Sequence, residues 1–361
     1  MSEKNSHASA DSAPHDLRLP FLTAELPGIS GTIKKTPDDF DVEEIPAYEP
    51  AGAGEHLFLW IEKRDRSAAD LVHHVSQTLG IASHQVGTAG LKDRQAVTRQ
   101  YVSVPAAHTA HVDRLNSDCY RVLASRLHSN KLKTGHLRGN RFSILVRDVA
   151  ETSDNRLRMI ADRVEQLGFP NFYGNQRFGS GGETLKLGFD LLKQRRSRRD
   201  LPRRQQKFLT RLALSAAQSW MFNQALAQRL LEGTLHRVLA GDVMQVAASG
   251  GCFVADDVDT EQRRFESRET VITGPIFGPK MKRPTGEVAS QEAKVQSDQE
   301  LTGEEFRLFG KLTLGTRRPY LVWPSEFNVV QESDGVRFRF ALPSGVYATT
   351  LLREFMKSRD E

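Results

Sequence analysis

The stretch Gly87-Thr-Ala-Gly-Leu-Lys-Asp-Arg-Gln-Ala-Val-Thr-Arg-Gln-Tyr-Val-Ser-Val-Pro105 joins a polar loop to an alternating segment, Arg99 to Val104. That alternation predicts a strand with one buried face. In the loop, Asp93 lies between Lys92 and Arg94, whose positive charges favour its ionised form. An ionised aspartate is a candidate nucleophile or anionic stabiliser and a poor general acid. The alternative is a solvated surface loop with weak ion pairs.

Strands and helices are predicted on both sides of this stretch. Strands are indicated by alternating, branched or aromatic residues at 31–45 (interrupted by a turn), 54–63, 141–146, 326–331 and 336–342. Asp334-Gly335 predicts a hairpin between the last two. Helices are predicted at 67–80 (with Ser67 as N-cap), 154–166, 202–231, 303–312 and 351–357. Strands around a helix-rich middle indicate an α+β fold that carries an inserted domain.

Length and composition set the class of protein. The chain has 361 residues, 50 Lys and Arg against 45 Asp and Glu, a net charge of +5 and a pI near 9.2. That length suits two domains, and the charge excess is too small to imply nucleic acid by itself. No run approaches the roughly 18 apolar residues of a membrane span, and the polar N-terminus lacks the apolar core of a signal peptide. A disordered tail and a cytoplasmic location are expected.

Cysteine and histidine content argues against disulfides and metal. Cys119 and Cys252 are the two cysteines, far apart in the sequence. They predict neither a disulfide framework nor a structural zinc site, and they suit a reducing cytosol. His108 and His111 are three residues apart but lack acidic or thiol partners nearby. We therefore expect no metal.

A basic segment, defined here as Lys193 to Arg211, holds nine cations and one acid, Asp200. Such a density of charge can bind a phosphate backbone through release of counterions. A solvated helix-and-linker face is the alternative interpretation. The motif Asn171-Phe-Tyr-Gly-Asn-Gln-Arg-Phe-Gly179 could stack bases and bind their edges, or it could form a buried aromatic turn.

The motif Gly139-Asn-Arg-Phe142 places Asn140 and Phe142 on the same side of a strand. An amide and a ring on one face could recognise a base, although a core phenylalanine beside a turn asparagine is the default interpretation.

Taken together, these segments resemble the TruD family of tRNA pseudouridine synthases. The resemblance is carried, in the family's order, by Thr36-Pro-Asp-Asp-Phe40, Ala89 to Gln100, Gly139 to Phe142, Asn171 to Gly179, and Phe340-Ala-Leu-Pro-Ser-Gly345. It implies a catalytic domain with a mixed, mostly antiparallel sheet at 21–166 and 320–361. It also implies an inserted α/β TRUD domain at 167–319, after a disordered tail at 1–20.

The resemblance also implies an activity and site residues. The family isomerises uridine at position 13 of certain tRNAs without metal or organic cofactor. By analogy Asp93 is the nucleophile, and Phe142 stacks on the target base. Phe40, Asn140 and Phe340 would line the base pocket. Lys34 matches a basic residue near the carboxylate, although Lys35 stands beside it. The partner is tRNA, with no membrane, and a monomer is expected.

Two other functions fit part of the sequence. A non-catalytic RNA-binding protein or RNA chaperone would use the basic segment and the aromatic motifs without changing any base. A glycoside hydrolase would pair Asp93 with Asp39 or Glu44 as a second carboxylate, about 5–9.5 Å away across the substrate. The cations around Asp93 and in the basic segment suit a polyanion better than a neutral sugar.

Overall fold

The computed structural model describes residues 19–150 and 154–357, and these form two compact units. One unit comprises Phe21–Phe169 with Val322–Ser358, and the other is Pro170–Leu321. Short strands β7 (Phe169–Pro170) and β12 (Leu321–Val322) mark the two places where the chain passes between them. The predicted tail, residues 1–20, lies almost entirely outside the described residues.

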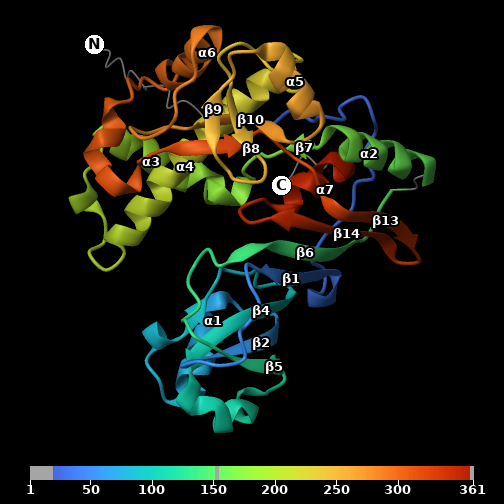
Figure 1. Ribbon diagram of the computed structural model, residues 1–361, viewed down its shortest axis with the longest axis vertical. Helices are drawn as coiled ribbons and strands as arrows, with labels where there is room; N and C mark the ends of the chain where they lie inside the picture. Colours follow the sequence, from blue (N-terminus) through green and yellow to red (C-terminus); the bar gives the residue numbers. More distant parts are fainter. Residues whose placement is uncertain (1–18, 151–153, 358–361) are drawn as a thin grey trace, which may run out of the picture. The chain divides into compact units, whose positions relative to one another are not determined.

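The discontinuous unit is built on an eight-stranded sheet. Along the main path the strand order is β13-β14-β6-β1-β4-β2-β5 (Figure 1). Off this path, β3 pairs with β4. The pair β1–β4 is parallel, and the other pairs described in this sheet are antiparallel. The predicted mixed, mostly antiparallel sheet of an α+β fold is thus confirmed. The strands are β1 (Phe40–Pro46), β2 (His56–Arg64), β3 (Gly87–Thr88), β4 (Val97–Pro105), β5 (Tyr120–His128), β6 (Leu137–Val146), β13 (Ser325–Glu332) and β14 (Gly335–Pro343).

Three helices pack on one face of this sheet: α1 (Ala68–Leu79), α2 (Asp154–Leu167) and α7 (Ala348–Met356). Helices α2 and α7 contribute to the core over β14, β6 and β1, and α1 packs over β2 and β4 (Figure 1). Side chains that are directly opposed across neighbouring strands share a face. The register therefore aligns one row of side chains across five strands: Lys63, Thr98, Val42, Phe142 and Phe340. This transverse row belongs to the helix-covered face.

Local signals predicted several elements correctly. Ser67 caps α1, with its hydroxyl accepting from the Asp70 amide at 3.1 Å, and Gly80 ends the helix in the left-handed region at φ 66°. Asp334-Gly335 joins β13 to β14 as predicted. Gly335 has φ 147°, and a Cβ there would lie 2.0 Å from the Val146 carbonyl oxygen. Only glycine fits this close approach.

Other predictions needed correction. Strand β5 escaped notice because most of its side chains are exposed or half-buried and give no clear apolar alternation. The first strand expected at 31–45 is only a bridge between Thr32 and Arg147, followed by a short 3-10 turn. The helix expected from 202 begins at Gln206, and the segment Glu304–Leu312 is 3-10 with a non-helical Gly310.

The second unit combines helices with a four-stranded antiparallel sheet of order β11-β10-β8-β9. Its long helix α4 (Gln206–Leu231) packs against α3 (Glu183–Leu192) and β10. A buried ion pair joins Arg317 to Glu292 through two hydrogen bonds of 2.7 and 2.9 Å. The remaining elements are β8 (Val243–Val246), β9 (Cys252–Val254), α5 (Val258–Glu266), β10 (Thr270–Ile276), α6 (Gly286–Ser297) and β11 (Thr316–Pro319).

The Ser67 cap gives a stability test of the α1 side of the sheet. Changing Ser67→Ala leaves the Asp70 amide without its side-chain acceptor, so the free energy of unfolding should fall by about 1 kcal/mol. Urea denaturation followed by circular dichroism measures this, with Ser117→Ala, an exposed serine shortly before β5, as the matched control. Equal stability of the two variants would contradict the assigned role of the cap.

Candidate active site

The site forms where the beginnings of two parallel strands meet. Because β1 and β4 run parallel, with Asp41 opposite Val97, the segments that precede them lie at the same end of the sheet. Lys34 precedes β1 and Asp93 precedes β4. The Lys34 ammonium donates to Asp93 Oδ1 at 2.8 Å. The parallel pairing therefore brings together two residues that are 59 positions apart.

Lys34, and not Lys35, is the lysine that contacts the carboxylate. Its backbone lies in the left-handed region at φ 60°, which is uncommon for a residue other than glycine and recurs at functional sites. Its Nζ also lies 4.2 Å from the centre of the Phe40 ring, within cation–π range. Lys35 instead forms an ion pair with Asp148.

The loop that carries Asp93 is tied to its surroundings at several points. The Ala89 carbonyl accepts from the Gly135 amide at 2.8 Å, and the Asp65 amide donates to the Ala96 carbonyl at 3.1 Å. Between these, the Lys92 ammonium donates to the carboxylate of Glu44 at 2.8 Å, with both side chains buried. Lys92 adjoins Asp93 in the sequence, but the only carboxylate within ion-pair distance of its ammonium among the described residues is that of Glu44.

A second tether comes from beneath the loop. Lys63 Nζ donates to the main-chain carbonyl of Asp93 at 2.6 Å and to that of Arg66 at 2.7 Å. Sequence reasoning missed this lysine. The signal was present, since Lys63 continues the inward series of β2 after Leu59 and Ile61, where a charged residue is unexpected.

Three predicted aromatic residues lie together under the site. The Phe40 and Phe142 rings meet edge-to-face, with 6.3 Å between their centroids. The centroids of the Phe142 and Phe340 rings are 5.3 Å apart. Phe142 is 7% exposed, against 2% for Phe40 and 0% for Phe340. Contacts therefore run from Asp93 through Lys34 to Phe40, and from Phe40 to the other two rings, although the rings belong mainly to the core.

Asn140 lies beside this aromatic group on β6, opposite Glu44 of β1 and Leu342 of β14. The residue is partly buried, and its side-chain oxygen is a buried atom with no hydrogen-bond partner in the described part of the chain. A buried unpaired carboxamide oxygen is costly and available to a ligand that can donate.

An open pocket of about 560 Å³ lies beside the carboxylate. It is lined by Lys34, Asp65, Asp93, Arg94 and Gln95, and the Asp93 side chain is 40% exposed. The predicted residues Phe40, Asn140, Phe142 and Phe340 are absent from this lining.

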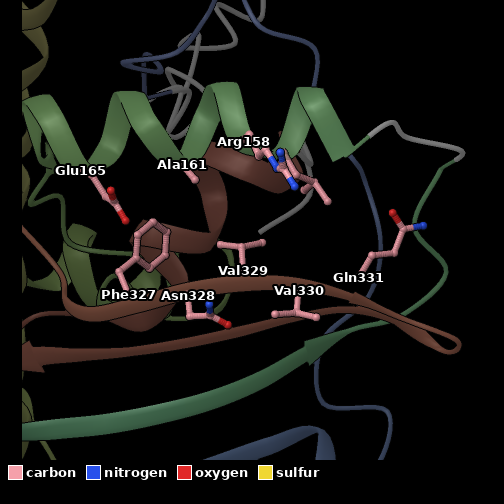
Figure 2. Close-up of a pocket in the computed structure, with 9 residues that line it drawn as sticks. Arg158, Ala161, Glu165, Phe327, Asn328, Val329, Val330 and Gln331 are labelled. Atoms are coloured by element: carbon pink, nitrogen blue, oxygen red, sulfur yellow. The ribbon is translucent and has the colours of Figure 1, made fainter.

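A different pocket, of about 420 Å³, lies between α2 and β13 (Figure 2). Phe327 and Val329 point from the strand toward the helix there, opposite Ala161 and Glu165. It contains none of the predicted site residues.

A smaller pocket, of about 270 Å³, includes Phe142 and Phe340 in its lining but not Asp93. The pocket at Asp93 is the candidate site because both Asp93 and Lys34 line it.

The second carboxylate that a glycoside hydrolase needs is not free. Asp39 is buried and accepts from Arg147 at 2.8 and 3.0 Å. Burial works against its ionisation, but the bonds from Arg147 and Thr36 outweigh it and hold the pKa of Asp39 below its usual value. Glu44 is occupied by Lys92 and by the Tyr101 amide. These pairings disfavour a two-carboxylate mechanism.

In the second unit, the basic segment is largely unpaired. Lys193 and Arg195 contact Glu300. Seven exposed cations of the segment have no carboxylate within ion-pair distance among the described residues: Arg196, Arg198, Arg199, Arg203, Arg204, Lys207 and Arg211. Phe208, among them, is 66% exposed. Free cations around an exposed ring are typical of a surface that binds nucleic acid.

The aromatic motif 171–179 is structural in character. Phe172 and Phe178 are 1% and 0% exposed. Asn171 is buried, and its side-chain amide donates to the Pro319 carbonyl at 2.9 Å. Arg177 donates to Ser219 at 3.3 Å. The buried-turn interpretation therefore fits this motif better than base stacking.

Within residues 19–150 and 154–357, no group of three or more His, Cys, Asp and Glu residues could hold a metal ion. In the same residues, no helix has both the length and the apolar character needed to cross a membrane.

Comparison with known proteins gives a consistent result. The family model of TruD, tRNA pseudouridine synthase D, matches residues 17–199 and 199–355. The chain is 40% identical to tRNA pseudouridine synthase D of Anaeromyxobacter dehalogenans, across 95% of this chain and 98% of the relative. It is also 40% identical to the Thermus thermophilus protein of that name, across 94% of this chain and 92% of the relative.

The fold agrees with a solved structure. A Methanosarcina mazei chain assigned to tRNA pseudouridine synthase D superposes with a TM-score of 0.76 at 23% identity, covering 94% of this chain and 96% of that chain. Because a model of the family and relatives of nearly equal length both match, the chain belongs to the TruD family of tRNA pseudouridine synthases.

Proposed function

We propose that this protein isomerises uridine to pseudouridine at position 13 of tRNA, with Asp93 as the nucleophile and no cofactor. The coarse activity, pseudouridine formation in tRNA, follows from membership of the family. One observation carries the finer assignment: Asp93 lies at an open pocket, bonded to Lys34, which in turn lies over Phe40. Position 13 rests on the family resemblance.

The reaction suits an ionised aspartate. The N1–C1′ bond of the nucleoside breaks, the uracil turns, and C5 bonds to C1′ while the C5 proton is lost and N1 gains one. Asp93 can attack C1′ or C6 and leave when the new bond forms. The Lys34 ammonium donates to Asp93 Oδ1 at 2.8 Å, and we assign it the role of orienting the carboxylate toward the reacting nucleoside.

The base would be held from two sides. Stacking on Phe142 would retain the detached uracil and contribute about 1–3 kcal/mol. The unpaired Asn140 oxygen could accept from the N3–H of uracil, while Phe40 and Phe340 support the Phe142 ring. Flipping the target base out of a folded tRNA costs a few kcal/mol. The basic segment would offset this cost by binding phosphates, and we expect a cytoplasmic monomer.

The role of Asp93 is tested by Asp93→Asn, which keeps the size of the side chain but removes its charge. We expect loss of pseudouridine formation, measured by carbodiimide labelling of treated tRNA, with tRNA affinity retained. Asp148→Asn is the matched control, because Asp148 pairs with Lys35, the neighbour of Lys34. Full activity of Asp93→Asn would refute the nucleophile, and a wild-type protein that binds tRNA without product would favour the non-catalytic RNA-binding alternative.

Lys34 can be distinguished from Lys35 by the same assay. Lys34→Met removes the cation that bonds the carboxylate, so kcat should fall by about 10²-fold or more, the scale on which lost positioning and charge stabilisation act. Lys35→Met removes an exposed partner of Asp148 and should leave kcat within about twofold, the scale expected of a surface pair. Equal effects of the two changes would exclude a specific role for Lys34.

The basic segment is tested by the salt dependence of binding. Replacing Arg203 and Arg204 by Ser should weaken tRNA binding and lower the slope of log K against log salt by about 1–2, since each phosphate contact contributes about 0.7–0.9. Replacing Lys282 and Arg283, two adjacent exposed cations of the same unit, is the matched control. An equal loss in both variants would show an effect of net charge and not of the basic segment.

A further inference from the structure

Lys63 is a fully buried lysine directly below the loop that carries Asp93. It is 0% exposed, and it stands in the transverse row of the helix-covered face, opposite Thr98. Two of its three N–H donors bind main-chain carbonyl oxygens, that of Asp93 at 2.6 Å and that of Arg66 at 2.7 Å. Its ammonium has no carboxylate within ion-pair distance in the residues that the structure describes.

Burying the Lys63 ammonium costs free energy that a residue with only a structural role would not need to spend. Removing an ammonium from water costs several kcal/mol unless it is well paired, and an apolar side chain of similar volume is often as stabilising or more so. Leu57, Leu59 and Ile61 occupy the equivalent inward positions of β2 with apolar side chains. A lysine at the next inward position therefore needs an explanation beyond packing.

We propose that Lys63 is a positioning residue for the reaction: it fixes the main chain of Asp93 while Lys34 fixes the carboxylate. The inference rests on the proposed role of Asp93. With a cation on the carbonyl and another on the side chain, both ends of the residue are held, and the carboxylate has little freedom relative to the pocket.

Such a tether acts on the rate of the bound complex. A displacement of about 1 Å at a reacting group can cost about 10²-fold in rate. Lys63 itself is buried and does not line the pocket, so it contributes no contact to the RNA. Its loss should therefore lower kcat and leave KM and tRNA affinity nearly unchanged.

The charge of Lys63 depends on pH near the physiological range. Burial is the dominant influence and lowers the pKa of Lys63 to about 8. The charged groups that act on it are Asp93, which raises the pKa, Lys92, which lowers it, and Asp65 and Asp70, which raise it. Below pH 8 the ammonium holds the loop strongly, and above pH 8 a neutral amine holds it weakly. Activity should fall as pH rises through 8.

Stability should respond in the opposite direction. The pKa of Lys63 in the folded protein lies below the unfolded value of about 10.4. Between these values the unfolded chain binds more protons, so the contribution of Lys63 to stability increases as pH rises. If Lys63 had only a structural role, activity would follow stability as pH rises. If Lys63 positions Asp93, activity should fall with rising pH while stability increases.

The test compares the wild type, Lys63→Met and Lys63→Arg between pH 6.5 and 9.5, with the same tRNA so that titration of the substrate is common to all. In the wild type we expect kcat to decline with a midpoint near 8 while circular dichroism shows a folded protein. Lys63→Met should lower kcat about 10- to 100-fold at pH 7, and its kcat should show no decline near pH 8. Its KM should equal that of the wild type, and its melting temperature should be equal or higher. Lys63→Arg keeps its charge throughout, so it should recover part of kcat and also lack the decline.

Several results would overturn the inference. One is a wild-type kcat with no decline near pH 8, and another is Lys63→Met with wild-type kcat and the wild-type profile. If Lys63→Met does not fold, the wild-type profile and Lys63→Arg decide the question. Lys35→Met, an exposed lysine, is the control for loss of one positive charge. Full activity of Asp93→Asn would contradict the proposed function itself. If Asp93→Asn is inactive and Lys63→Met is unaffected, only the positioning role of Lys63 is contradicted.

Discussion

The parallel pairing of β1 with β4 is the constraint on which the site depends. It places the starts of both strands at one end of the sheet, so that Lys34 meets Asp93. The antiparallel partner β2 then ends at the same place and presents Lys63. On the other side of β1, the antiparallel β6 sets Phe142 next to Phe40. Slippage of one residue in this register would turn strand residues such as Lys63 and Phe142 to the opposite face.

Three lysines hold one short loop in place, two through side-chain carboxylates and one through main-chain carbonyls. Lys34 holds a side-chain carboxylate, Lys63 a main-chain carbonyl and Lys92 the distant carboxylate of Glu44. The loop is therefore shaped by charge more than by apolar packing, and its Leu91 remains 86% exposed. A loop with so many fixed contacts loses little further freedom when a ligand arrives, which favours preorganisation.

Local patterns in the sequence predicted much of this molecule. The cap at Ser67, the hairpin at Asp334-Gly335 and the α+β class were readable because each rests on neighbouring residues or on composition. The family resemblance pointed to Asp93 and to Lys34, which a hydrogen bond joins in the structure. The partners of Lys63 and Lys92 could not be predicted, because they depend on strand register between distant segments. Strand β5 was missed because its exposed side chains conceal any alternation.

The interrupted course of the sheet has a consequence for biosynthesis. Strand β6 ends at Val146, but β14, which pairs with it, begins only at Gly335, after the whole of Pro170–Leu321. At about 5–20 residues per second, a ribosome needs on the order of 10–40 s to cover that gap. Throughout this interval the nascent β6 presents an unpaired backbone edge, which is a site for wrong pairing. Completion of the eight-stranded sheet is therefore a late event, after residues 170–321 have already left the ribosome.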